Sequence, residues 1–258
     1  MVASVHDNKM RIENEREQRA LAVGGSPYYY HVHLSMPCNQ KCIMCVPDGR
    51  HARDTLPFEQ FEAIFEKVRA HAEHITLIGG EPLMYPRFLD VLDLLAKHEI
   101  AVTINTNATM LTDRVVPRLL GLHELWLKCS IDAATRETYR RIRGTDVFDK
   151  VTAHIEAFCR EAERRPRIRP ILVYVVMREN LDEVLPFVDL AAERLRPYRI
   201  HFNPVRHVSG WQVSNGTGWH FDGLEQSCEY FADEYNAVMR EAAARCDKLG
   251  LRHDVTLV

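Results

Sequence analysis

No apolar run in the 258-residue sequence approaches the length of a membrane span, and the charge-rich first twenty residues lack the apolar segment of a secretory signal. The chain also lacks an excess of either charge, because 33 lysines and arginines stand against 36 aspartates and glutamates, a net charge of −3. That balance disfavours a nucleic-acid-binding domain, which carries a basic surface. We therefore expect a cytoplasmic protein that binds neither membrane nor nucleic acid.

Cysteine is also scarce, and its distribution is uneven. Seven cysteines occur in the chain, an odd number that argues against a secreted disulfide scaffold and favours metal or redox chemistry in a reducing compartment. Three of them, Cys38, Cys42 and Cys45, lie in the octapeptide CNQKCIMC. The other four are scattered and form no second closely spaced pair, so we expect them to be small buried apolar residues: Cys129, Cys159, Cys228 and Cys246.

Three thiols close together in sequence are suited to hold a soft metal ion or an iron–sulfur cluster. A structural zinc ion takes four protein ligands, so a zinc site would need His33 or His51 in addition to the three cysteines. A [4Fe–4S] cluster held by three thiolates leaves one iron open to an exogenous ligand, which explains an odd number of cysteines without a missing residue. Both kinds of site remain open on the spacing alone.

Short β-like runs alternate with amphipathic helical patterns after residue 25. Strands that are each followed by a helix predict a parallel sheet covered by helices on its outer face, and right-handed crossovers curl such a series into part of a barrel. We expect an α/β fold with an N-terminal helical extension (1–25) and a partial, TIM-like (β/α)6 barrel (26–258) that ends in one long helix (224–250). The expected strands are 28–36, 74–79, 100–107, 124–132, 168–177 and 198–205, and the clearest helical patterns are 57–72, 85–99 and 181–195.

Polar residues stand at the predicted ends of the strands, where parallel α/β barrels gather their ligands. The cysteine loop follows the first strand and GGEP follows the second, whereas Asn105 and Asn107 end the third. Period-two alternation puts Lys128, Ser130 and Asp132 on one face of the fourth strand, as expected for a polar barrel interior. The sequence therefore predicts one site at this edge of the sheet.

The pattern CxxxCxxC directly after a first strand resembles the signature of the radical S-adenosylmethionine (SAM) superfamily, and the resemblance extends from about residue 28 to residue 205. It implies that Cys38, Cys42 and Cys45 hold a [4Fe–4S] cluster whose fourth iron is chelated by the amine and carboxylate of SAM. It also implies that Met44, at a position that is often aromatic in the family, packs near the adenine. By the same resemblance, the reduced cluster cleaves SAM to a 5′-deoxyadenosyl radical, which abstracts hydrogen from a substrate.

Further residues stand where the family binds SAM. GGEP resembles the second motif of the family, which meets the SAM amino group, and this implies that Glu81 either accepts from the SAM ammonium or braces the loop. The same residues also suit a plain strand-to-helix turn in which Pro82 begins a helix. By resemblance, Ser130 meets the SAM carboxylate or ribose, and Arg143 in YRRIRG pairs with the carboxylate, for which a guanidinium is well matched. The cofactor contacts implied or suggested in this way are Met44, Gly79, Gly80, Glu81, Pro82, Asn105, Asn107, Ser130, Arg143 and Val205.

Three stretches, SIDAATRETYRRIRG, VMREN and PVRH, resemble members of the superfamily that carry a C-terminal SPASM or twitch domain. The sequence stops about where such a domain would begin, so either the barrel acts alone or the natural protein is longer. The expected partners are a peptide or small-molecule substrate and an electron donor such as flavodoxin or ferredoxin, with residues 206–223 as a loop that closes over the substrate. The alternatives are a non-catalytic zinc or iron–sulfur binding α/β protein, and an α/β-barrel enzyme whose cysteines are incidental.

Overall fold

The computed structural model describes residues 5–45, 54–206, 212–214 and 220–258. Seven strands form one sheet in which every neighbouring pair is parallel, in the order β1-β2-β3-β4-β5-β6-β9. The sheet is open, since β1 and β9 stand at its two edges, and it confirms the α/β partial barrel expected from the sequence. The strands are β1 (Tyr29–Ser35), β2 (His74–Gly79), β3 (Ala101–Thr106), β4 (Glu124–Ser130), β5 (Ile168–Val176), β6 (Arg199–Pro204) and β9 (His253–Asp254).

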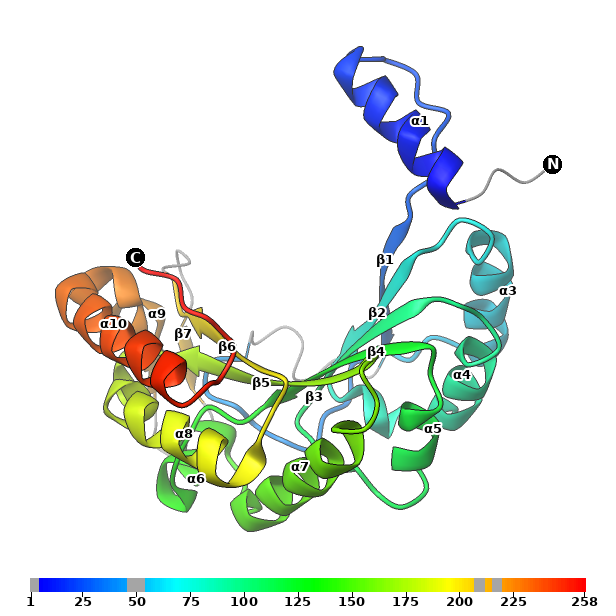
Figure 1. Ribbon diagram of the computed structural model, residues 1–258. Helices are drawn as coiled ribbons and strands as arrows, with labels where there is room; N and C mark the ends of the chain where they lie inside the picture. The colour runs from blue at the N-terminus through cyan, green and yellow to red at the C-terminus, as the bar shows by residue number, and fades with distance from the viewer. Residues whose placement is uncertain (1–4, 46–53, 207–211, 215–219) are drawn as a thin grey trace.

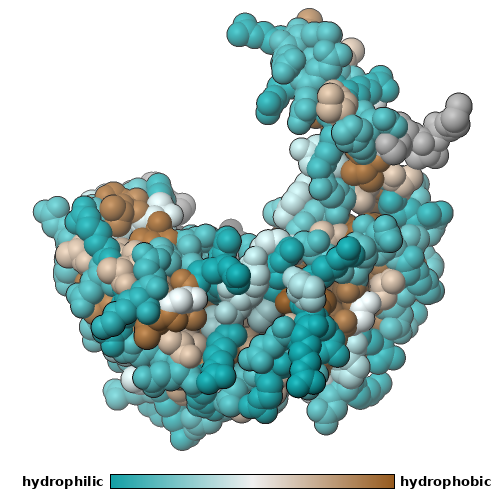
Figure 2. Space-filling model, viewed as in Figure 1, coloured by the Kyte–Doolittle hydropathy of each residue, from teal (hydrophilic) through white to brown (hydrophobic). Residues whose placement is uncertain are grey.

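Helices follow the strands and lie together on the convex side of the curved sheet, while the opposite side is left open (Figure 1). In Figure 2 the molecule is hollowed on that open side, between the N-terminal arm and the C-terminal helices. The helices are α1 (Val5–Glu17), α3 (Phe58–Val68), α4 (Phe88–Leu95), α5 (Val116–Leu120), α6 (Arg136–Arg143), α7 (Phe148–Ala162), α8 (Val184–Leu190), α9 (Gly223–Gln226) and α10 (Ala232–Lys248), with the 3-10 helices η1 (Pro82–Met84), η2 (Arg178–Glu183) and η4 (Cys228–Phe231) and the π-helix η3 (Ala191–Leu195).

Side chains of the strands alternate between the helical layer and the inner face of the sheet. In β4, Leu125 and Leu127 are fully buried in the core, while Lys128 and Ser130 are only partly buried. Burial of a leucine side chain contributes about 1.5–3 kcal/mol, so the contact with the helices stabilises the sheet and leaves its inner face free to carry polar residues. The predicted alternation agrees with this burial for Leu127, Lys128 and Ser130.

The C-terminal helix is shorter than predicted, because the segment 224–250 is broken at Ser227. There the backbone is extended (φ −71°, ψ 126°), and the Ser227 hydroxyl accepts a hydrogen bond from the Glu229 N–H. The break lets the Cys228 N–H donate to Val205 O at 2.9 Å, which ties the segment to the end of β6. Cys228 and the other three scattered cysteines are buried, as expected.

The N-terminal segment contains α1 and folds back on itself. Asn8 exchanges two hydrogen bonds with the backbone of Ser26, and the Glu15 carboxylate accepts from the N–H groups of Gly24 and Gly25. Figure 1 shows α1 standing away from the sheet. The division of the chain into an extension and a barrel at residue 25 stays a prediction. None of the described helices is long and apolar enough to cross a membrane.

Two predicted features fall partly or wholly outside the described residues. Within the segment 206–223, strands β7 (Gln212–Ser214) and β8 (His220–Asp222) form an antiparallel pair, while residues 207–211 and 215–219 lie outside the described ranges. Closure of this segment over a substrate therefore stays a prediction. His51, a candidate zinc ligand, also lies outside them.

Candidate cofactor site

A cavity of about 260 Å³ opens at the carboxyl ends of β2, β3 and β4, beside the cysteine loop. Pro82 and Val205 are absent from its lining, and Gln40, Ile78 and Thr106, which the sequence did not suggest, contribute to it. The remaining candidate residues come together here from widely separated parts of the chain. They are Cys38, Cys42, Met44, Cys45, Gly79, Gly80, Glu81, Asn105, Asn107, Ser130 and Arg143.

The C-terminal end of α6 holds the cysteine loop in place. The Lys41 N–H donates to Arg143 O at 3.2 Å, and the Ile43 N–H donates to Ile142 O at 2.9 Å. Gly144 ends the helix with φ +66°, and a Cβ at this position would lie 2.7 Å from Lys41 O. Glycine therefore lets the helix end approach the loop this closely.

The two glycines at the end of β2, Gly79 and Gly80, are required by a contact within the protein. The Gly80 N–H donates to Ser35 O at 2.9 Å. A Cβ on Gly79, which has φ +142°, would lie 2.1 Å from Ser35 O, and a Cβ on Gly80 would lie 2.0 Å from Met36 O. Both residues thus allow the end of β2 to pack against the start of the cysteine loop.

Glu81 braces the junction between β2 and β3. Its side chain is buried, and its carboxylate accepts hydrogen bonds from the Leu83 N–H (3.1 Å), Thr106 Oγ1 (2.7 Å) and the Asn107 N–H (2.7 Å). Burial raises the pKa of this carboxyl, and the hydrogen bonds from Asn107 and Thr106 oppose that shift. These contacts agree with a bracing role for Glu81, and Pro82 begins the short helix η1.

The two asparagines at the end of β3 have different surroundings. Asn107 donates from Nδ2 to Asn39 Oδ1 at 2.7 Å and to Cys38 Sγ at 3.9 Å. Asn105 is exposed in the cavity and, like Ser130, forms no side-chain hydrogen bond among the described residues. Asn107 therefore supports the cysteine loop, whereas Asn105 and Ser130 are available to a ligand.

Arg143 joins the cysteine loop to a buried carboxylate. Its Nη1 donates to Cys42 Sγ at 3.5 Å, and its Nη2 forms an ion pair with Asp132. The sequence predicted that Asp132 continues the face of Lys128 and Ser130, but Asp132 lies beyond the end of β4. The alternation stops because β4 ends at Ser130, and Asp132 adopts φ +57° and is fully buried. Arg143 thus reaches the cavity with its guanidinium already paired.

A small apolar cluster lies beside the last turn of the cysteine loop. Val205 is 5% exposed and packs with Ile43, Ile142 and Met177, and Met44 lies against the same cluster. Met44 also lines the cavity, whereas Val205 does not. Ligand sites commonly combine such an apolar wall with a few polar groups, and Met44 presents the wall here.

The three thiols of the loop lie together at one cavity. Thiolates that lie side by side in this way can each bind a separate iron of a cluster. Burial raises the pKa of Cys42 to about 11, against the opposing charge of Arg143, and burial also raises the pKa of Cys38. These thiols must therefore lose protons as metal binds.

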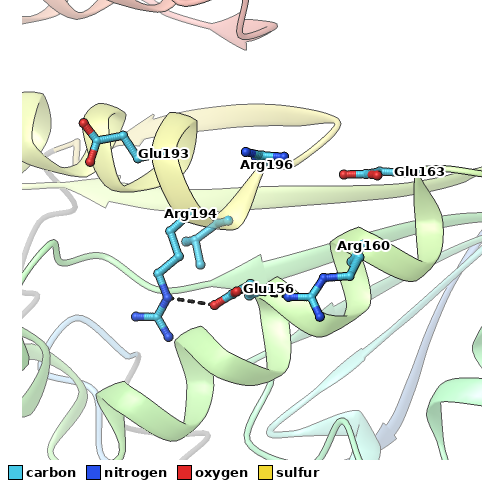
Figure 3. A pocket seen from close by; sticks show the side chains of 7 residues that line it. Glu156, Arg160, Glu163, Glu193, Arg194 and Arg196 are labelled. Carbon is cyan, nitrogen blue, oxygen red and sulfur yellow. Dashed lines mark hydrogen bonds and ion pairs between the residues drawn. The ribbon is translucent and has the colours of Figure 1, made fainter.

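A second cavity, of about 390 Å³, lies on the outer side of the protein between α7 and η3 (Figure 3). Glu156 at its centre pairs with both Arg160 (3.1 Å) and Arg194 (2.8 Å), so this carboxylate already has charged partners within the protein. Exposed ion pairs of this kind contribute little to stability. The lining contains no cysteine, so the cavity beside the cysteine loop is the candidate site.

Comparison with known proteins points to one superfamily. The sequence model described as the radical SAM superfamily matches residues 34–191. Mycofactocin maturase MftC of Mycobacterium tuberculosis (strain CDC 1551 / Oshkosh) is 27% identical over 174 residues, which are 64% of this chain and 44% of that protein. GTP 3′,8-cyclase of Shewanella denitrificans is 23% identical over 212 residues, which are 76% of this chain and 62% of that protein.

Among solved structures, SuiB of Streptococcus suis bound to SAM has a TM-score of 0.73 at 16% sequence identity, over 96% of this chain and 54% of that chain. At this identity the likeness shows the fold. The chain spans about half the length of MftC and of SuiB. Because the superfamily model matches more than half of the chain, the chain belongs to the radical SAM superfamily, whose enzymes use a [4Fe–4S] cluster and SAM.

Proposed function

We propose that the protein is an enzyme in which Cys38, Cys42 and Cys45 hold a [4Fe–4S] cluster beside a bound SAM, and that it acts on a peptide or a small metabolite. The observation that carries the proposal is the meeting of the three thiols with the ends of β2, β3 and β4 in one cavity. When bound, the cluster and SAM supply the one-electron reduction and the 5′-deoxyadenosyl radical that abstracts a hydrogen atom from the substrate.

The residues of the cavity would divide into two groups. Gly79, Gly80, Glu81, Asn107 and the Pro82 turn hold the cysteine loop and the ends of β2 and β3 in place, as their contacts with the protein support. A second group meets SAM. Ser130 offers a hydroxyl and Asn105 an amide to its polar groups, and Met44, backed by Val205, offers an apolar wall to the adenine.

Two kinds of relatives support the two substrate classes. SuiB has been solved with its precursor peptide SuiA, and MftC is named as a maturase, whereas GTP 3′,8-cyclase is named for a nucleotide. In this protein the substrate would lie on the inner face of the sheet, where Trp126 and Lys128 stand on the same side of β4 as Ser130. An electron donor such as flavodoxin or ferredoxin would reduce the cluster.

Anaerobic reconstitution with iron and sulfide tests the proposal. We expect about four irons and four sulfides per chain, an EPR signal of the reduced cluster that changes when SAM is added, and 5′-deoxyadenosine under dithionite. Cys42→Ala should lose the cluster and SAM cleavage, whereas Cys159→Ala, which removes a buried thiol from α7, should keep both. A fully loaded cluster that leaves SAM intact, or a colourless zinc protein, contradicts the proposal.

A further inference from the structure

The guanidinium of Arg143 lies between a thiol of the cysteine loop and a buried carboxylate. Nη1 is 3.5 Å from Cys42 Sγ, and Nη2 is paired with Asp132. The side chains of Arg143 and Asp132 are 7% and 0% exposed. A buried guanidinium is costly to desolvate unless its partners compensate it, so this geometry depends on both partners.

The main chain of Arg143 holds the same loop. Its carbonyl oxygen accepts from the Lys41 N–H at 3.2 Å, one residue before the thiol that its side chain contacts. The next residue, Gly144, packs against the Lys41 carbonyl. Arg143 therefore holds the loop at two neighbouring residues, Lys41 through its backbone and Cys42 through its side chain.

Asp132 is itself held firmly. Its Oδ1 accepts from the Val175 N–H at 2.7 Å, and its backbone oxygen accepts from Asn180 Nδ2 at 2.9 Å. Asn180 is fully buried, and its Oδ1 accepts from the Met177 N–H at 2.9 Å. The position of the carboxylate is thus set by the ends of β4 and β5 and by η2, none of which belongs to the cysteine loop.

We infer that Arg143 is a positioning residue whose hydrogen bond to the Cys42 thiolate raises the reduction potential of the cluster, and that Asp132 limits the charge which the guanidinium presents. The inference rests on the proposed function, because it requires Cys42 to be a cluster ligand. Hydrogen bonds to cluster sulfurs and nearby positive charge stabilise the reduced, more negative form of the cluster. The contacts of Arg143 with Asp132 and Cys42 support this role, which is separate from the contact with the SAM carboxylate that the resemblance implied.

An EPR-monitored redox titration of the reconstituted protein, carried out without SAM, tests the inference. Arg143→Gln should shift the midpoint potential to more negative values, and Arg143→Lys should lie between that variant and the natural protein. Asp132→Asn should shift the potential in the opposite direction, because the guanidinium is then left with Cys42 as its charged partner. Arg141→Gln is the matched control, since Arg141 lies on the same helix and pairs with Glu179; it should leave the potential unchanged.

Opposite shifts in Arg143→Gln and Asp132→Asn support the inference, because general damage to the loop gives no reason for opposite signs. A fully loaded Arg143→Gln cluster with the natural potential overturns it. If Arg143→Gln fails to load, Asp132→Asn decides: a more positive potential supports the inference, and an unchanged or more negative one overturns it. The variants can show these shifts even if the natural protein cleaves no SAM. That result would contradict the proposed function and leave this inference standing.

Discussion

Replacement of Glu81 by glutamine tests whether this carboxylate stabilises the fold in the absence of any ligand. The amide oxygen of glutamine can take the place of Oε1 and accept from the Leu83 N–H and Thr106 Oγ1. The amide NH2 then faces the Asn107 N–H, which donates to Oε2 in the natural protein at 2.7 Å. Two donors would oppose each other in a site where the side chain is 1% exposed.

The size of the effect follows from those contacts. A hydrogen bond to a charged group contributes about 1.5–3 kcal/mol, and a buried donor without a partner costs about 1–3 kcal/mol. The cost of keeping a carboxylate buried, which raises the pKa of Glu81, offsets part of this loss. We expect Glu81→Gln to lower the free energy of unfolding by about 2–4 kcal/mol, or the melting temperature by roughly 5–12 °C in a chain of this length.

Denaturant unfolding of the cluster-free chain, followed by circular dichroism, measures this difference. Glu62→Gln serves as the control, because Glu62 is an exposed glutamate of α3, and it should change the free energy of unfolding by less than about 0.5 kcal/mol. If Glu81→Gln is as stable as that control, the carboxylate does not brace the fold, and a role confined to ligand binding becomes the better explanation.

Two further predictions concern α6 and its surroundings. Gly144→Ala should reduce the iron bound on reconstitution, because the new Cβ would lie 2.7 Å from Lys41 O. Gly250→Ala is the control and should bind iron normally, since Gly250 has a similar positive φ but nothing within 4 Å of the added Cβ. Equal iron contents in the two variants would refute the argument from close approach. Burial opposes ionisation of Glu183, but hydrogen bonds from Thr135 and the Ala134 N–H outweigh it and lower the pKa of that carboxyl below 4.5. The ionised Glu183 therefore stabilises the fold fully at a pH above its pKa in the unfolded chain. This stabilisation is lost as the pH falls through the lower pKa of the folded protein. Glu183→Gln should thus unfold more easily than the natural protein at pH 7, and the difference should shrink below pH ~4; a difference that is constant with pH would contradict this.

The sequence predicted the strands well where apolar runs are long and helices separate them. It missed β9, because two residues carry no periodicity, and this strand is held by the pairing of Arg199 with Asp254, 55 residues later in the chain. It also predicted an unbroken C-terminal helix. The break at Ser227 carries no proline or glycine, and it is stabilised by the bond from Cys228 to the end of β6.

The meeting of the site residues was predictable because parallel strands end at the same edge of the sheet. What their side chains contact was less so. Asp132 lies past the end of β4, is fully buried and pairs with Arg143, and no local pattern announces its positive φ. Gln40 gave no signal at all, because its partner Tyr139 is 99 residues away. Thr106 was overlooked because, in a strand, its side chain is expected on the opposite face from that of Asn105. Its hydroxyl nevertheless donates to Glu81, and Thr106 lines the cavity.

The contacts between the end of α6 and the cysteine loop have a consequence for the order in which the site forms during synthesis. Arg143 and Cys42 are 101 residues apart, so joining them closes a long loop at an entropic cost of about 4 kcal/mol. At synthesis rates of about 5–20 residues per second, the cysteines emerge roughly 5–20 s before the helix that shapes them. During that interval only the residues next to them in the sequence restrain the positions of the thiols. Delivery of iron to a nascent chain would therefore meet a flexible ligand set, and the ordered site becomes available only after the chain has grown past Gly144.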